Sequence, residues 1–180
     1  MPFIAIIKAI NKRIDITQVE HPKLQYSYGD CICQLCRAPL RIRGGPLVRN
    51  HFAHDADRPC DTEYSYQPES PEHREAKRFL LERLRKEFPE YRTATIDVEV
   101  PIIEIKRVAD ILVTFLTGWK QAHEIQLSSI TADELEERTN DYERAGIDVV
   151  WWLGKGANVE SNRRWCIQKF GCNFSLNFSD

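Results

Sequence analysis

The sequence of 180 residues predicts a mixed α+β (α/β) protein with a small metal-binding segment in its N-terminal part. Two observations carry this prediction. After residue 68, the apolar residues follow helical and strand periods in the order helix, three strands, helix, strand. Before that point, four of the six cysteines and two histidines gather within residues 31–60. We therefore expect two domains, residues 1–66 and residues 67–180.

The overall composition is that of a folded globular protein, with 42% hydrophobic and 29% charged residues. The apolar run at residues 2–7 is too short to span a bilayer, and Lys8 interrupts it, so we expect a cytoplasmic protein with no membrane partner. The net charge of −2 gives no general attraction to nucleic acid. Any such binding must come from local basic clusters, which are otherwise solvated faces. The two clusters are Arg37, Arg41, Arg43 and Arg49, and Lys77, Arg78, Arg83, Arg85 and Lys86.

The first elements are two short strands, a linker and a long helix. Alternation predicts strands at residues 3–9 and 12–19, and residues 61–67 have the composition of a linker. Ser70 suits the N-cap of the helix, and Pro71 suits its first position because no backbone donor is needed there. Helical spacing of apolar residues continues to about residue 88.

The remaining chain predicts a meander of three strands, then a helix and a buried strand. Thr131 is the expected cap of this second helix, and Gly146 its end. The predicted ranges are strands at 95–105, 107–116 and 120–128, a helix at 132–145, a strand at 148–153 buried on both faces, and a strand at 164–170.

The cysteine and histidine spacing in residues 31–60 predicts a structural Zn²⁺ site. Zinc takes four thiolate and imidazole ligands, and the Cys33-x2-Cys36 turn places two sulfurs at the required separation. A segment with few periodic apolar residues cannot form a large core, so it also needs a stabilising link such as a bound metal ion. We predict His54 and Cys60 as the second pair, while His51 or Cys31 remains an alternative for the fourth ligand.

Three polar residues interrupt two of the apolar strands. Asp110 lies near the start of one, and Glu124 and Gln126 alternate on the next, so they share a face. A connecting loop of three or five residues places Asp110 opposite one of them on that face, whereas a two-residue turn would separate them. Two converging carboxylates form an oxygen-rich site suited to Mg²⁺ or Mn²⁺.

These motifs, in this order, resemble the PD-(D/E)xK nuclease superfamily and, more closely, the competence protein CoiA-like family. The resemblance covers about residues 31–153. The matching words are His51-Phe52-Ala53-His54, Glu69-Ser70-Pro71-Glu72-His73 with Lys77, Arg107-Val108-Ala109-Asp110, Glu124-Ile125-Gln126-Leu127-Ser128, and Arg138 with Tyr142 ahead of Trp151-Trp152-Leu153.

The resemblance implies a restriction-endonuclease-like core, with a zinc-finger-like domain before it, that binds DNA and a catalytic divalent metal. Asp110 and Glu124 would ligate this metal, with the Ile125 carbonyl as a further ligand. Gln126 stands where most of the superfamily has lysine, so it would only orient water or phosphate. Glu72 would be a carboxylate reaching the metal from the helix, unless it serves only the helix dipole. The implied substrate-binding residues are His73, Lys77, Arg107, Arg138 and Tyr142. Lys77 could also supply the positive charge that Gln126 lacks. His73 could instead cap its helix, and Arg138 and Tyr142 could instead pack their helix on the sheet.

The function that follows is Mg²⁺- or Mn²⁺-dependent hydrolysis of single- or double-stranded DNA, in DNA uptake, processing or recombination with other DNA-processing proteins. Two alternatives remain open. The chain could be a DNA-binding or adaptor module of nuclease fold without useful turnover, as Gln126 and the acidic net charge suggest. It could also be a zinc-stabilised protein-interaction domain.

Overall fold

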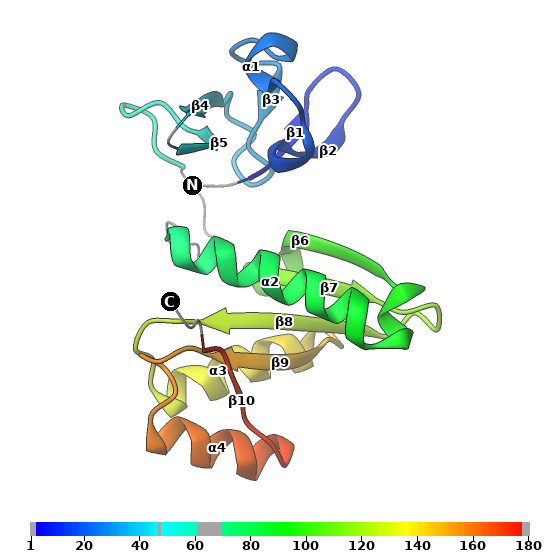
Figure 1. Ribbon diagram of the computed structural model, residues 1–180, viewed down its shortest axis with the longest axis vertical. Coiled ribbons are helices and arrows are strands. Elements are labelled where there is room, and N and C mark those ends of the chain that lie inside the picture. Colours follow the sequence, from blue (N-terminus) through cyan, green and yellow to red (C-terminus); the bar gives the residue numbers. More distant parts are fainter. Residues whose placement is uncertain (1–2, 47, 61–69, 178–180) are drawn as a thin grey trace. The chain divides into compact units, whose positions relative to one another are not determined.

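The computed structural model describes residues 3–46, 48–60 and 70–177, and the chain divides into two compact units, Met1–Glu69 and Ser70–Asp180 (Figure 1). The expected linker at residues 61–67 lies outside the described residues. Among the residues that are described, no helix is both long enough and apolar enough to cross a membrane.

The N-terminal unit contains two small antiparallel sheets. The first has the order β2-β1-β3, and the second is a hairpin. The expected strand at residues 12–19 ends early, because the Asp15 side chain accepts a hydrogen bond from the Thr17 N–H and starts a 3-10 turn. The elements are β1 (Ile4–Ile7), β2 (Lys12–Asp15), η1 (Ile16–Gln18), α1 (Pro22–Gln25), β3 (Cys31–Ile32), β4 (Arg41–Gly45) and β5 (Val48–Ala53).

The two sheets enclose a small apolar core, which the sequence did not indicate for the cysteine segment. Phe52 and Leu40 are almost fully buried in it and pack with Cys31 and Cys33. Gly44 lies at an irregularity in the β4–β5 pairing, between Arg43 and Gly45, where φ is +131° and an added Cβ would lie 2.7 Å from the Asn50 Cα. Only glycine fits at this position.

The C-terminal unit is a five-stranded mixed sheet of order β10-β9-β8-β7-β6. Strands β6 to β8 form an antiparallel meander, whereas β9 runs parallel to β8 and β10 parallel to β9. This arrangement confirms the predicted α+β class. The strands are β6 (Thr95–Ile102), β7 (Arg107–Thr114), β8 (Lys120–Gln126), β9 (Asp148–Leu153) and β10 (Phe174–Ser175).

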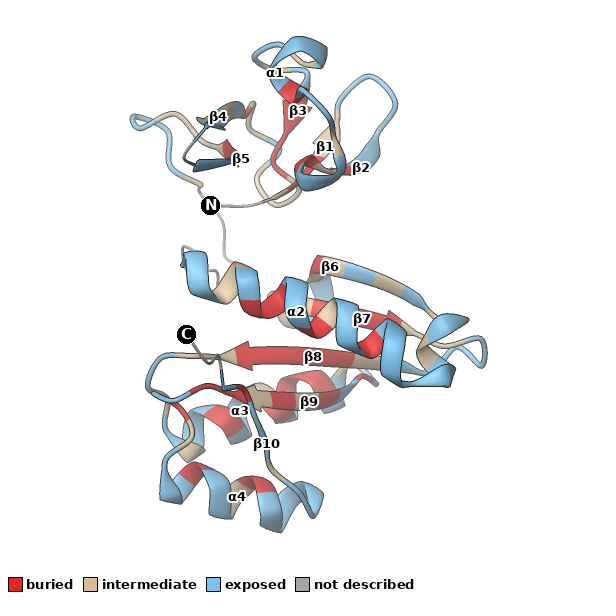
Figure 2. Cartoon of the chain, in the orientation of Figure 1, coloured by how far each residue is buried: buried red, intermediate tan, exposed pale blue. Residues whose placement is uncertain are grey.

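Helices cover both faces of this sheet, with α2 on one face and α3 and α4 on the other (Figure 1). Each face therefore has its own apolar core, and β8 between them is buried along most of its length (Figure 2). The helices are α2 (Pro71–Glu87), α3 (Ala132–Arg144) and α4 (Glu160–Phe170), with 3-10 turns η2 (Pro89–Arg92) and η3 (Ile103–Ile105).

Helix α2 begins as its sequence predicts. The Ser70 hydroxyl accepts the His73 N–H at 3.2 Å, and Pro71 occupies the first turn. The face that meets the sheet carries Ala76, Lys77, Leu80 and Leu84. The helix therefore presents position 73, one turn before Ala76 and Lys77, towards the strands.

The expected strand at residues 164–170 is wrong, because this segment belongs to helix α4. The charged residues of the segment have helical spacing, since Glu160 forms ion pairs with Arg163 and Arg164, which follow it by three and four residues. Gly171, with φ at +76°, ends the helix in a left-handed conformation.

Strand β9 was expected to be buried on both faces, but only one of its faces is buried. Val149, Trp151 and Leu153 lie in the core shared with α3, whereas Val150 and Trp152 on the other face are partly exposed. The ring of Trp152 is covered there by Phe174 of β10, at 4.9 Å between centroids. The short strand β10 thus covers part of the β9 face that remains partly exposed.

We predict that the cap of α3 contributes measurably to stability. Thr131 and Glu134 form a reciprocal capping box, in which each side chain bonds the backbone N–H of the other residue. Replacing Thr131 by Ala should cost about 1 kcal/mol, or a few degrees in melting temperature, in thermal denaturation. Ser129→Ala, at an exposed site two residues earlier, is the control. Equal melting temperatures for the two variants would contradict the prediction.

Candidate active site and metal centre

The β7–β8 connection brings Asp110 and Glu124 face to face. Its loop has five residues, 115–119, closed by a 2.9 Å bond from the Phe115 N–H to the Trp119 carbonyl. The strand register pairs Ile111 with His123, so one step further Asp110 lies opposite Glu124. Opposite residues of an antiparallel pair share a face. The odd loop length that the carboxylate hypothesis requires is therefore present.

The two carboxylates also hold the strands together at this point. Glu124 Oε1 accepts the Asp110 N–H at 3.2 Å, and Asp110 Oδ2 accepts the Ile125 N–H at 2.9 Å. Each side chain thus bonds the backbone of the opposite strand. These bonds consequently bring together the carboxylate oxygens of Asp110 and Glu124 and the peptide group of Ile125.

Helix α2 reaches this region through His73 and not through Glu72. His73 Nε2 lies 3.2 Å from Asp110 Oδ2 and 2.8 Å from the Ile125 carbonyl oxygen. Both neighbours are acceptors, so this nitrogen carries a proton. Glu72 is exposed in the first helical turn, where an acidic residue suits the helix dipole. A role for Glu72 at the metal stays a prediction, and its exposed place in the first turn favours the alternative that it serves the helix dipole.

Helix α3 reaches the other carboxylate. Glu124 is only 1% exposed; its Oε1 accepts the Tyr142 hydroxyl at 2.8 Å, and its Oε2 accepts a guanidinium N–H of Arg138. Arg138 also donates to Gln126 Oε1 at 3.2 Å and lies 4.7 Å from the centre of the Trp151 ring. A cation is therefore fixed beside Gln126, although Gln126 itself is neutral.

These surroundings push the two carboxyl pKa values apart. Burial tends to raise the pKa of Asp110, but the hydrogen bond and charge of His73 and the charge of Lys77 outweigh it, so the value is lowered. For Glu124, burial and the nearby charge of Asp110 raise the pKa, and Arg138 and Tyr142 offset this only in part. Asp110 is consequently the more firmly ionised member of the pair.

A buried ion pair that the sequence analysis missed stands beside Asp110. Lys77 Nζ donates to Glu99 Oε1 at 3.0 Å, and both side chains are less than one-tenth exposed. Glu99 adopts a left-handed conformation with φ of +51° inside β6, at the register position opposite Asp110. The alternation of Asp97 and Glu99 is that of a solvent-facing strand edge, so the sequence offered no signal for this contact.

Two residues expected to bind substrate instead contact other residues of the C-terminal unit. Arg107 pairs with Asp141 and, at 3.6 Å, with Glu137, which ties β7 to α3. Tyr142 is fully buried, so its hydroxyl serves Glu124 and not a phosphate at the surface. For both, the structure shows a contact within the fold, and substrate binding stays a prediction.

Close backbone packing fixes the end of β8, where Gln126 lies. The Gly154 N–H donates to the Gln126 carbonyl at 2.8 Å, and the Gly156 N–H to the Leu127 carbonyl at 3.2 Å. A Cβ at Gly156 would lie 2.6 Å from that Leu127 oxygen. The Gln126 amide meanwhile donates to the Ser128 carbonyl and hydroxyl, which leaves its oxygen for Arg138.

The donor set around Asp110 fits a hard divalent cation. Carboxylate and carbonyl oxygens are the ligands that Mg²⁺ and Mn²⁺ prefer. Asp110 Oδ2 and the Ile125 carbonyl both accept a hydrogen bond from His73 Nε2, so these oxygens lie close together. Asp110 Oδ1 has no hydrogen-bond partner among the described residues, and the side chain keeps 18% exposure. With so few protein ligands, an ion would retain several waters, as Mg²⁺ commonly does.

The N-terminal unit contains a second candidate metal centre. The ligand atoms of Cys33, Cys36, His54 and Cys60 all lie within 4.8 Å of one another, so this cluster could bind a structural zinc ion. Cys33 Sγ and Cys60 Sγ are 3.8 Å apart. Two sulfurs of a tetrahedral site with Zn–S bonds of about 2.3 Å are roughly 3.8 Å apart, so the spacing fits.

The alternative fourth ligands lie outside this cluster. His51, on β5, has its Nδ1 2.9 Å from the Arg49 carbonyl, and Cys31 is buried in β3. Burial lowers the pKa of His54, which keeps the imidazole neutral as a metal ligand must be. Burial also raises the pKa of Cys60, and the neighbouring Cys33 and Cys36 raise it further.

A mixed sheet with paired carboxylates between two helices defines the second unit as a nuclease-like domain, and comparison with known families agrees. Residues 69–180 match the family described as "Competence protein CoiA, nuclease-like domain", and residues 15–63 match "Competence protein CoiA, N-terminal domain". The first match covers more than half of the chain, so the chain belongs to the CoiA family, as its sequence motifs predicted.

Among solved structures, the chain resembles one described as "Structure of EndoMS-dsDNA2 complex", with 13% identity and a TM-score of 0.42, over 83% of this chain and 73% of that one. It also resembles a repair endonuclease from Pyrococcus abyssi, with 18% identity and a TM-score of 0.35, over 64% of this chain and half of the other (50%). No inference rests on these low scores. No curated protein matches the chain.

We predict that the purified chain holds one zinc ion and that the cysteine–histidine cluster binds it. Replacing Cys33 and Cys36 together by Ser should abolish zinc binding, measured by elemental analysis, and should unfold the N-terminal unit, because its small core depends on the staple. Cys172→Ser, at an exposed cysteine of the other unit, should leave the zinc content unchanged. Full zinc content in the double variant would disprove the assignment.

Proposed function

We propose that the chain is a Mg²⁺- or Mn²⁺-dependent nuclease that hydrolyses DNA phosphodiester bonds at the Asp110–Glu124 site. The observation that supports this most is the pair of carboxylates facing each other across β7 and β8, of which Glu124 is buried and Asp110 is partly exposed, each held by a basic residue from a helix on either side. Placing two carboxylates so close together away from water is costly, and basic partners from both helices offset this cost. Sites with pKa values shifted in opposite directions are typical of catalysis.

A divalent ion bound here would supply Lewis-acid stabilisation of the phosphate and a more acidic water. Asp110 Oδ1, Glu124 Oε2 and the Ile125 carbonyl are the atoms proposed to hold it. His73 keeps the Asp110 carboxylate and the Ile125 carbonyl aligned through its shared N–H. Lys77 maintains the ionised form of Asp110, because its charge favours the carboxylate.

Arg138 is proposed to provide the positive charge that Gln126 lacks. Its guanidinium bonds both Glu124 and Gln126, so it lies beside the site that a lysine at position 126 would serve. Stacking on Trp151 and the bond to Gln126 restrict its position. Such a fixed cation can stabilise charge that develops on a phosphate in the transition state. Gln126 thereby becomes a positioning residue for Arg138.

The substrate and the cellular setting are part of the same proposal. We propose DNA as the substrate because the family description combines a competence protein with a nuclease-like domain. A role in DNA uptake or recombination, together with other DNA-processing proteins, follows from that description. Zinc is proposed as a structural ion of the N-terminal unit, separate from the catalytic ion.

A second candidate function is a nuclease-like DNA-binding module without turnover. The contacts of Glu124 favour it, since Oε1 accepts two hydrogen bonds and Oε2 accepts one from Arg138. A carboxylate engaged in this way binds metal less readily. The cleavage assay below distinguishes the two functions.

We predict that Asp110→Asn and Asp110→Ala each reduce Mg²⁺- or Mn²⁺-dependent DNA cleavage by at least about 100-fold, because a metal ligand is lost. The Asn variant keeps an acceptor for the Ile125 N–H, so its thermal stability should change little. Asp133→Ala, an exposed carboxylate in the first turn of α3, is the matched control and should cleave normally. Equal cleavage by wild type and Asp110→Asn would reject the proposed site, and no cleavage by wild type would favour the inactive module.

We also predict that Arg138→Ala lowers cleavage on the order of 100-fold and that adding Gln126→Lys restores part of the loss. The restored charge would come from the position where related nucleases carry lysine. Arg144→Ala, an exposed arginine on the same helix, controls for loss of charge. If the double variant stays as inactive as Arg138→Ala while folding equally well, the charge-replacement role is wrong.

A further inference from the structure

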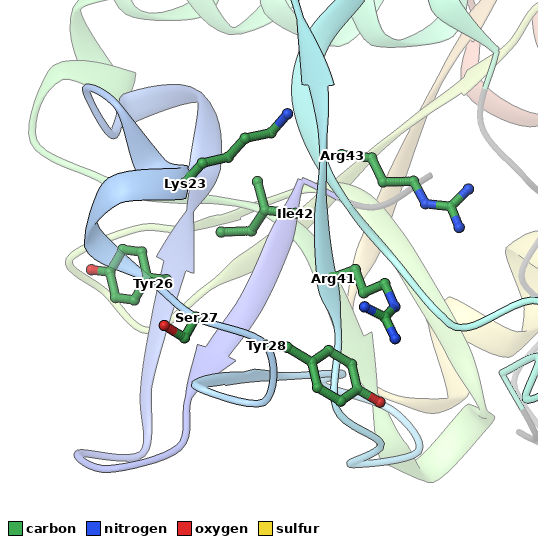
Figure 3. Close-up of a pocket in the computed structure, with 7 residues that line it drawn as sticks. All are labelled: Lys23, Tyr26, Ser27, Tyr28, Arg41, Ile42 and Arg43. Carbon is green, nitrogen blue, oxygen red and sulfur yellow. The ribbon is translucent and has the colours of Figure 1, made fainter.

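The N-terminal unit has an open groove of about 260 Å³ between α1, the loop after it and strand β4 (Figure 3). Three of the described residues that line it are basic, two are tyrosines, and none of these lining residues is acidic. The lining consists of Lys23, Tyr26, Ser27, Tyr28, Arg41, Ile42 and Arg43. The groove lies wholly within this unit and shares no residue with the carboxylate site.

Positive charge gathers in this part of the chain. Residues 1–60 contain nine Lys and Arg but only five Asp and Glu, although the whole chain carries a net charge of −2. This part of the chain therefore has a net positive charge, which attracts a polyanion. Local concentration of basic side chains is the usual electrostatic basis of nucleic-acid binding.

The aromatic side of the groove is held in place before any ligand arrives. The Arg41 guanidinium lies 4.3 Å from the centre of the Tyr28 ring, and both side chains bond Asp55, the Tyr28 hydroxyl at 2.6 Å. Tyr28 nevertheless remains 50% exposed. A half-exposed ring with a fixed orientation is a suitable surface on which a flat base can stack.

The basic side of the groove has charge available for a ligand. Arg43 is exposed, and its guanidinium has no partner among the residues that the structure describes. Lys23 donates to the Gly44 carbonyl, and its ammonium retains two further N–H groups. Both side chains come from elements that border the groove (Figure 3). They can contact phosphates while a base lies on Tyr28.

We propose that this groove binds single-stranded nucleic acid, with Lys23 and Arg43 on the phosphates and Tyr28 beneath a base. A duplex hides the faces of its bases in the stack, whereas a single strand offers them to an aromatic ring. The exposed tyrosine therefore favours the single strand. This binding is separate from the proposed cleavage, because none of these residues belongs to the Asp110–Glu124 site.

The groove also gives the zinc cluster a role beyond stability. Asp55, which anchors both Tyr28 and Arg41, directly follows His54, a proposed zinc ligand. A zinc ion that fixes His54 would also fix Asp55, and through it the stacking surface. Loss of zinc should therefore weaken strand binding as well as the fold of the unit.

The test is fluorescence anisotropy with labelled single-stranded DNA, single-stranded RNA and duplex DNA of equal length. The full chain is used, zinc-loaded and carrying Asp110→Asn, without added Mg²⁺ or Mn²⁺ so that no probe is cut. We expect Tyr28→Leu to weaken single-strand binding about tenfold through lost stacking. Arg43→Ala should weaken it several-fold and reduce the slope of log affinity against log salt by about 0.7. Comparison of the DNA and RNA arms identifies which single strand is preferred.

Lys12→Ala, an exposed lysine of β2 outside the groove, is the matched control, and zinc content verifies that each variant is folded. The proposal is overturned if Tyr28→Leu and Arg43→Ala bind single strands as tightly as Lys12→Ala does. It is also overturned if the two groove substitutions weaken duplex binding more than they weaken binding of either single strand. Cleavage by the protein with Asp110 intact is measured separately, so failure of the nuclease proposal and failure of the groove proposal are distinguishable.

Discussion

The exchange of hydrogen bonds between two carboxylates and the backbone of the opposite strand is the constraint on which the C-terminal unit depends. Glu124 receives the Asp110 N–H, and Asp110 receives the Ile125 N–H. Burying two negative charges so close together is unfavourable unless each is paired. The rest of the unit supplies these partners: His73 and Lys77 approach from α2, and Arg138 with Tyr142 from α3.

This requirement explains why both helices carry polar residues on faces that are otherwise apolar. Lys77 lies among Ala76, Leu80 and Leu84 on the buried side of α2, where it pairs with Glu99. Strain at Glu99, a non-glycine residue with positive φ, costs on the order of 1–3 kcal/mol. Apolar packing on both sides of the sheet offsets such costs and leaves the polar contacts in a water-poor environment, where electrostatic effects are strong.

The N-terminal unit meets a different constraint, since it has few residues with which to form a core. Its cluster of Cys33, Cys36, His54 and Cys60 lies beside a small set of buried apolar residues. In such a unit a metal ion and a modest core act together. The residue after His54 bonds Tyr28 and Arg41, so the same short segment connects the metal cluster to the basic groove.

Local signals in the sequence were sufficient for most elements. Ser70 and Thr131 cap their helices because hydroxyl groups satisfy free backbone N–H groups, wherever the helix then packs. Strand alternation predicted the meander but left the length of the β7–β8 loop open, and the structure supplied the five-residue loop and the register of Asp110 with Glu124. The spacing of cysteines and histidines limited the zinc ligands to a few combinations, of which the predicted one converges in space.

Choices between neighbouring residues needed the tertiary structure. Glu72 and His73 differ by about 100° around a helix, and only the packing of Ala76 and Leu80 decides which faces the strands. Glu99 alternates like a solvent-facing residue, yet α2 covers it and brings Lys77 to it. The sequence by itself therefore determined the order of the elements from α2 to β9 and the carboxylate, cysteine and histidine residues of the two candidate sites. The tertiary structure decided which side chains share a bond, because helix rotation and the covering of strand faces depend on contacts far apart in the chain.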